Sequence, residues 1–134
     1  MTITGLVGWS ARMHPARITL PATSASASLG RAWARLILDG SPGRAPVEQV
    51  IGELIGEALD HGAEGDVDVS LHRAPAECLV VVTSLETGAE APSAGVDLVE
   101  HPRLVIVDAL AESLEQHVGA DGVVVMRARI TWVE

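Results

Sequence analysis

The segment from residue 46 to residue 61 has the clearest hydrophobic pattern in the sequence and constrains the fold more than any other feature. Its apolar residues recur at the spacing of one helix face, and Pro46 suits the first turn of a helix. Gly62 follows as a natural C-terminal stop. The apolar positions are Val47, Val50, Ile51, Leu54, Ile55, Ala58 and Leu59. The pattern predicts an amphipathic helix with one face in the core.

Other segments have the patterns of strands and helices. Alternating or continuous apolar residues predict strands, and residues 74–77 form a turn that joins two of them as a hairpin. The predicted strands span residues 17–20, 66–73, 78–83 and 123–133, and the other predicted helices span residues 23–38 and 102–118. Antiparallel strands with three helices on one face make a two-layer α/β (α+β) sandwich, which is the fold class that we predict.

The first predicted helix begins at a cap formed by Thr23 or Ser24. Residues 85–99 are rich in Gly, Ala, Pro and acidic residues and have no periodicity, so they predict a long loop of the kind that often acts as a lid. A chain of 134 residues suits one domain, at residues 16–134, after an extension at residues 1–15. The apolar face of the first helix comprises Ala25, Leu29, Ala32, Trp33, Leu36 and Ile37.

The composition excludes several classes of function. The net charge is −9, and the sequence contains no Lys, Asn, Phe or Tyr. Without lysine there is no P-loop lysine and no Schiff-base lysine. An acidic chain with few aromatic residues repels a phosphate backbone and has little on which to stack bases, so we expect no nucleic-acid binding.

Cysteine content and targeting signals indicate a cytoplasmic protein. A single cysteine, Cys78, excludes an internal disulfide and suits a small core residue in a reducing compartment. Residues 1–9 lack a preceding basic region, and no stretch approaches the ~18 apolar residues of a membrane span, so we expect no signal peptide and no membrane contact. No zinc site is predicted, because the histidines show no metal-ligand spacing. They are His14, His61, His72, His101 and His117.

The central helix also carries a motif. The segment Glu53-Leu-Ile-Gly-Glu57-Ala-Leu-Asp-His61-Gly62 resembles the N-box helix of the GHKL ATPase superfamily. It is most similar to that of small anti-sigma-factor serine kinases of the RsbW and SpoIIAB type, which commonly reads Glu-x-x-x-Asn-Ala-x-x-His-Gly. The likeness extends over roughly residues 16–133.

Three further features support this resemblance. Pro21-Ala22 precedes a Ser/Ala-rich first helix, and the lid-like loop lies where the family has one. The stretch from Leu104 to Leu110 is similar to the family's Gly-x-Gly-Leu-x-x-Val-x-x-Leu. The resemblance implies a Bergerat/GHKL-like fold and a homodimer formed through the first strand and helix. It also implies a protein partner, either a sigma factor or an anti-sigma antagonist.

The resemblance also implies roles for individual residues. Glu53 corresponds to the glutamate that polarises the attacking group, and is the candidate catalytic residue. Glu57 stands in the place of the Asn that coordinates Mg²⁺. The candidate ATP-binding residues are Glu57, His61, Gly62, Glu86, Gly88 and Arg103.

The chain departs from the family pattern in three boxes. Glu57 in place of Asn adds a second anion beside Glu53, although Mg²⁺ does accept carboxylates. Ser84 lies where the family has an adenine-reading Asp, and Glu86-Thr-Gly88 is a displaced substitute.

The third box should supply Gly-x-Gly, whose bare N–H groups cradle phosphate at a helix N-terminus. The chain has His101-Pro102-Arg103 there, and Pro102 removes one of those donors. Arg103 could offer its charge to a phosphate, but its simpler role is that of a solvated residue at a helix start. Together the departures predict that ATP binding is weakened or lost, so that no cofactor is expected unless the pocket retains Mg-ATP.

The same residues also fit simpler structural roles. Glu53, Glu57 and Asp60 could form a solvated helix face, on which the first two repel each other at i,i+4. His61 could be a residue that favours the negative end of the helix dipole. Arg127 and Arg129 on the last predicted strand suit the exposed face of a strand at the sheet edge.

Two functions therefore stand beside each other. The favoured hypothesis is a regulatory protein-binding module that resembles an anti-sigma factor in a partner-switching system, with little or no ATP turnover. The alternative is an active ATP-dependent protein serine kinase, with Glu53 as base, Mg²⁺ held by Glu57 and Glu86 reading adenine. An unrelated α/β sandwich is the third possibility.

Overall fold

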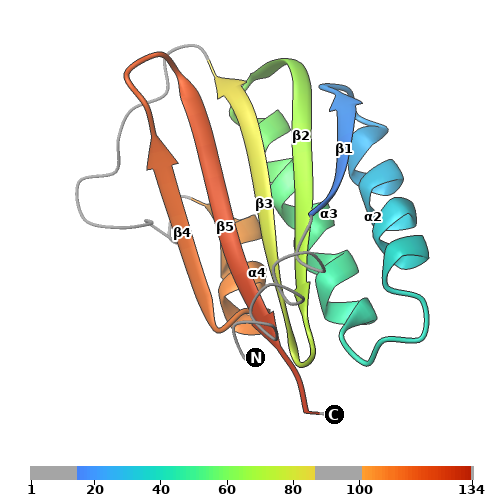
Figure 1. Ribbon diagram of the computed structural model, residues 1–134. Helices are drawn as coiled ribbons and strands as arrows, with labels where there is room; N and C mark the ends of the chain where they lie inside the picture. The colour runs from blue at the N-terminus through green and yellow to red at the C-terminus, as the bar shows by residue number, and fades with distance from the viewer. Residues whose placement is uncertain (1–14, 87–100, 134) are drawn as a thin grey trace, which may run out of the picture.

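The computed structural model describes residues 15–86 and 101–133. The described residues form one five-stranded sheet and three helices. Figure 1 shows that the sheet is twisted and that the helices lie behind one of its faces. This arrangement confirms the predicted two-layer sandwich of antiparallel strands and helices. The elements are β1 (Ala16–Pro21), α2 (Ser26–Ile37), α3 (Arg44–Asp60), β2 (Ala63–Ala74), β3 (Glu77–Glu86), α4 (Pro102–Leu110), β4 (Ser113–Val118) and β5 (Val123–Thr131).

The strands lie in the order β1-β2-β3-β5-β4, and every neighbouring pair is antiparallel. The pairs β2–β3 and β4–β5 are hairpins, whereas β1 pairs with β2 across the intervening helices α2 and α3. Alternate residues of each strand face the helices, so Val69, Val82 and Met126 lie in the core and their chain neighbours face outward.

The central helix α3 packs across the sheet, as its pattern predicts. Its stripe from Val47 to Ala58 is buried. The helix begins at Arg44, two residues before the predicted start, because the N–H that Pro46 lacks would have no intrahelical partner in the first turn. It ends as predicted: Gly62 adopts a φ of +84°, a left-handed conformation that glycine enters without steric cost.

The prediction for α2 was wrong in two respects. Its N-cap is Ala25, which makes no side-chain cap, and the carbonyl of Thr23 instead accepts the N–H of Ser26. The inner face of α2 also differs from the predicted one: Gly30 and Ala34 are buried, whereas Leu29 and Leu36 of the apolar face are exposed. Small residues allow α2 to approach α3 closely, while Trp33 and Ile37 pack partly against the core.

The predicted third helix was wrong beyond Leu110. Ala111 adopts an extended conformation with a ψ of 148°, and residues 113–118 form β4. Leu114 and Val118 satisfy a strand alternation as well as a helix period, and pairing with β5 decides between them. The chain order therefore gains a strand after the last helix, and β5 ends at Thr131 rather than at residue 133.

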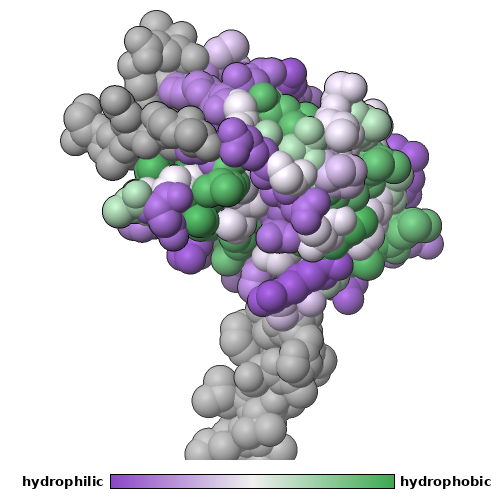
Figure 2. Space-filling model, turned by 90° about the horizontal axis from the view of Figure 1, so that it is seen from above, coloured by the Kyte–Doolittle hydropathy of each residue, from purple (hydrophilic) through white to green (hydrophobic). Residues whose placement is uncertain are grey.

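Several expectations concern segments at the margins of the described chain. Leu85 and Glu86 belong to β3 rather than to the predicted loop. The rest of that loop and almost all of the predicted extension at residues 1–15 lie outside the described residues. No helix within the described ranges has both the length and the apolar character that crossing a membrane requires. Figure 2 shows hydrophobic and hydrophilic residues interspersed over the face seen from above.

Candidate functional site

The C-terminal half of α3 meets the start of α4 around a buried carboxylate. Glu57 is 3% exposed, so the simpler alternative that it stands on a solvated helix face is wrong. It lies seven residues after Val50 and three after Leu54, and both of those residues are buried. The helix period therefore turns Glu57 into the core at the edge of the apolar stripe.

Two imidazole rings contact this carboxylate. His61 Nε2 lies 2.7 Å and His101 Nδ1 lies 2.5 Å from the same Oε2 atom of Glu57. His61 comes from the next turn of α3, while His101 immediately precedes α4. The rings are tilted by 32°, with centroids 4.8 Å apart. These contacts meet the requirement that a buried carboxylate have polar partners.

A second buried carboxylate lies nearby, at the end of β3. Glu86 accepts a hydrogen bond of 2.7 Å from the hydroxyl of Ser84. Burial raises the pKa of Glu86, and the charges of Glu57, His61 and His101 all act on it. Three of the four buried polar residues within the described ranges thus gather where α3 meets β3, and such gathering is typical of functional sites.

Arg103 binds the acidic residues of α3. Its Nε donates to Asp60 Oδ2 at 2.8 Å, and its Nη1 donates to Glu53 Oε1 at 3.2 Å. The guanidinium packs closely against α3 because residue 56 is glycine: a Cβ at Gly56 would come within 2.6 Å of the Cζ atom of Arg103. Arg103 is therefore engaged with its own chain rather than simply solvated.

The fold brings most of the predicted site residues together. Glu53, Glu57, His61, Glu86 and Arg103 surround the junction of α3, β3 and α4. Gly62 ends α3 beside them, and Gly88 lies outside the described residues. Two contacting residues were missing from the predicted set. They are His101 and Asp60.

The contact of His101 with Glu57 had no signal in the residue spacing, because 44 positions separate the two residues. The involvement of Asp60 could have been found from helix geometry. Asp60 stands seven residues after Glu53, so both carboxylates lie on one face of α3 and a single guanidinium can reach them.

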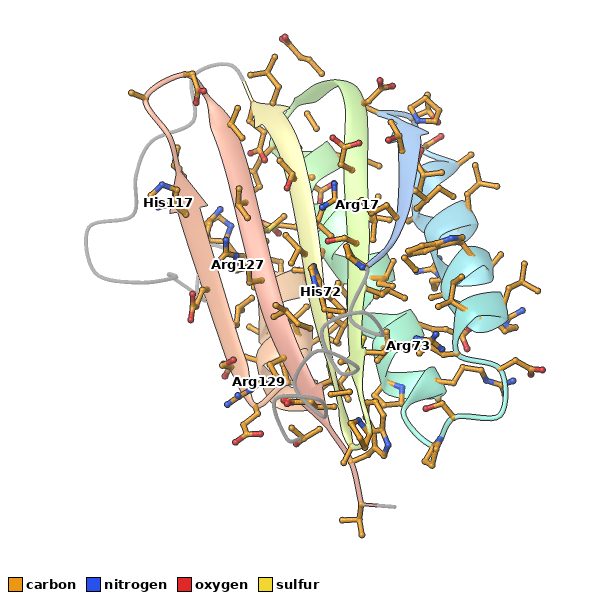
Figure 3. The ribbon with its side chains drawn as sticks, in the orientation of Figure 1. Arg17, His72, Arg73, His117, Arg127 and Arg129 are labelled. Atoms are coloured by element: carbon orange, nitrogen blue, oxygen red, sulfur yellow. The ribbon has the colours of Figure 1, made fainter. Side chains whose placement is uncertain are left out.

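The open face of the sheet carries a different group of side chains. Figure 3 shows Arg17, His72 and Arg127 on this face, from β1, β2 and β5. Burial, and then the charges of Arg17 and Arg127, lower the pKa of His72. Arg127 faces outward as predicted, but β5 is an interior strand, because β4 pairs along its other side and forms the edge.

Comparison with known proteins gives a match at the level of fold. Neither protein-family profiles nor curated proteins match this chain. Among solved structures, the crystal structure of the RsbU and RsbW domains of Rv1364c from Mycobacterium tuberculosis matches with a TM-score of 0.67 over 87% of this chain, at 23% identity. This chain therefore shares its fold with part of that structure. It covers 32% of the length of that chain.

Proposed function

We propose that this chain is a regulatory protein-binding module related to anti-sigma factors of partner-switching systems, with nucleotide binding weakened or lost. The observation that carries the proposal is that the chain's own side chains occupy the carboxylates of α3. Arg103 binds Glu53 and Asp60, and two imidazoles meet on Glu57. A scaffold can persist after the chemistry of its site has changed, because fold and site are separable.

The donor set of the described residues does not fit Mg²⁺ with a triphosphate. Magnesium requires oxygen ligands in near-octahedral order, whereas the Oε2 atom of Glu57 is engaged by two ring nitrogens. Pro102, the first residue of α4, offers no N–H to a phosphate. Glu53, Glu57 and Glu86 would also repel the anionic ligand, and Arg103 is already paired.

Nucleotide titration tests the proposal directly. We expect that millimolar MgATP or MgADP leaves the melting temperature unchanged and produces no binding heat in calorimetry. Micromolar binding, together with phosphate transfer that Glu53→Ala abolishes, would instead establish the kinase. Glu48→Ala is the matched control, because Glu48 lies on the same helix but pairs with Arg35 away from the site.

The same titration on Glu57→Asn shows how many boxes are altered. We expect no recovery of nucleotide affinity, because Pro102 and Arg103 still occupy the start of α4. Micromolar MgATP binding by this single variant would show that one residue accounts for the loss, and would contradict the proposal that three boxes are altered.

The outer face of α2 supports a homodimer as part of the proposed function. Leu29 and Leu36 lie two turns apart on one face of α2, and Leu36 is 78% exposed. Trp33 lies between them and is half-buried. An apolar stripe of this kind on a surface helix is typical of an interface. We infer that a second copy of this chain covers it.

Sedimentation analysis tests this dimer. We expect the unmodified chain to sediment as a dimer at micromolar concentration, and Leu36→Asp to sediment as a monomer because a desolvated charge would oppose association. Val105→Asp is the control, since Val105 is an exposed apolar residue on α4. A monomeric unmodified chain, or dissociation by both variants alike, would refute an interface on α2.

A further inference from the structure

Glu57, His61 and His101 offer three metal-ligating atoms close to one another, from a buried, an exposed and a partly buried side chain. One carboxylate oxygen and two imidazole nitrogens lie within 4.8 Å of one another. We call these three residues the His–Glu cluster. Glu57 and His61 stand at i and i+4 of α3, a spacing that places two side chains on one helix face and that helical zinc sites use. His101 completes the cluster from the start of α4.

We propose that the His–Glu cluster binds a divalent transition-metal ion, and that its donors favour Zn²⁺ over Mg²⁺. Imidazole nitrogen suits zinc, copper, nickel and iron, whereas magnesium prefers oxygen ligands and water. Two histidines and one carboxylate are also a known ligand set for zinc sites that leave the fourth position to water. This inference goes beyond the proposed function and does not depend on it.

The geometry needs only a small adjustment to accept the ion. Tetrahedral zinc with ligands at about 2.0–2.1 Å holds its ligand atoms roughly 3.3 Å apart. In the structure, His61 Nε2 and His101 Nδ1 lie 2.7 Å and 2.5 Å from Glu57 Oε2, so each nitrogen must move away from that oxygen by less than about 1 Å. The two ring nitrogens lie within 4.8 Å of each other and must reach the same separation. The ring of His61 can turn, since its side chain is 44% exposed, whereas His101 is partly buried and Glu57 is buried.

The charges around the cluster also favour a cation. Glu86 is a second buried carboxylate, and its charge interacts with Glu57 and with both rings. A buried carboxylate is costly in its charged form unless hydrogen bonds or a positive charge compensate it. A divalent ion held by the His–Glu cluster supplies that charge, and Glu86 would then stabilise it from outside the ligand set.

Calorimetric titration of the full chain with Zn²⁺, after removal of metals by a chelator, tests the site. We expect one ion per chain and a rise in melting temperature, while Mg²⁺ at millimolar concentration produces neither. Co²⁺ serves as a spectroscopic probe, because imidazole coordination in a tetrahedral site gives intense visible absorption.

Single substitutions then assign the ligands. We expect His61→Ala, His101→Ala and Glu57→Gln each to weaken Zn²⁺ binding by more than about 10-fold, because the loss of an outer-shell partner alone typically costs 10–100-fold. His72→Ala and His117→Ala are the controls. They remove histidines of other elements and should leave the affinity unchanged. Circular dichroism in the presence of chelator verifies that each variant is folded.

Several results would overturn the proposal. They include no zinc binding by the unmodified chain, equal weakening by control and cluster variants, or Mg²⁺ binding in preference to Zn²⁺. Nucleotide binding by the chain would refute the proposed function but not the metal site, so the two failures can be told apart.

Discussion

Replacing Ile51 by alanine should lower the free energy of unfolding by about 2–5 kcal/mol. Ile51 is fully buried in the middle of α3, and its side chain packs beside Gly30 of α2. The substitution removes buried apolar contact and leaves a cavity between tightly packed helices, which can collapse only partly. Urea denaturation followed by circular dichroism measures the change.

The matched control for this prediction is Ile106→Ala. Ile106 also lies on a helix, α4, but it is 41% exposed, so its truncation removes less buried apolar area and opens no enclosed cavity. We expect a loss of less than about 1 kcal/mol there, within the range of ordinary surface substitutions. Equal losses at the two positions would contradict the described core.

The thiol of Cys78 should be almost inert in the folded protein. Burial on β3 raises its pKa to about 12. Because the thiolate is the reactive form, an aromatic disulfide reagent at pH 8 should react about 1,000-fold more slowly with Cys78 than with an ordinary exposed thiol. Unfolding in urea should expose the thiol, so that it reacts at the ordinary rate and one thiol per chain is detected. The absorbance of the aromatic thiolate that the reaction releases measures the rate in the folded and in the unfolded protein.

A cysteine moved to an exposed position distinguishes protection by burial from a reagent that fails to react with any thiol. Ser24 is exposed before α2, so Ser24→Cys in a Cys78→Ser background should react at the ordinary rate without urea. Rapid modification of native Cys78 would show that β3 opens readily, and would contradict its place in the core.

The sequence was most informative where one pattern had one explanation. The stripe of α3 predicts both the helix and its buried face, because no strand produces apolar residues at that spacing over four turns. The alternation of β2 and β5 predicts which of their residues face the core in the same way. By contrast, Leu114 and Val118 fit a helix and a strand equally well, and only the ladder with β5 decides between them.

The candidate site was predictable in its members but not in its contacts. The motif in α3 placed Glu53, Glu57 and His61 together by local spacing alone. It could not place His101 or Arg103, because their contacts depend on how α4 packs against α3. Burial of Glu57 was predictable from its interval to Leu54, but the usual exposure of glutamate favoured the opposite interpretation.

The strand order has a consequence for local opening of the sheet. Among the strands that the structure describes, β1 pairs with β2 alone, and Leu20 is its one buried side chain. In the β1–β2 ladder, Ala16 pairs with Leu71, which lies 55 positions further along the chain. The strand pairs β2–β3 and β4–β5 are instead joined by tight turns. Detachment of β1 breaks one ladder and leaves both hairpins intact, so it costs less free energy than global unfolding. Amide hydrogens of β1 therefore exchange with solvent through a partial opening, whereas those of β3 and β5 exchange only when the whole core unfolds.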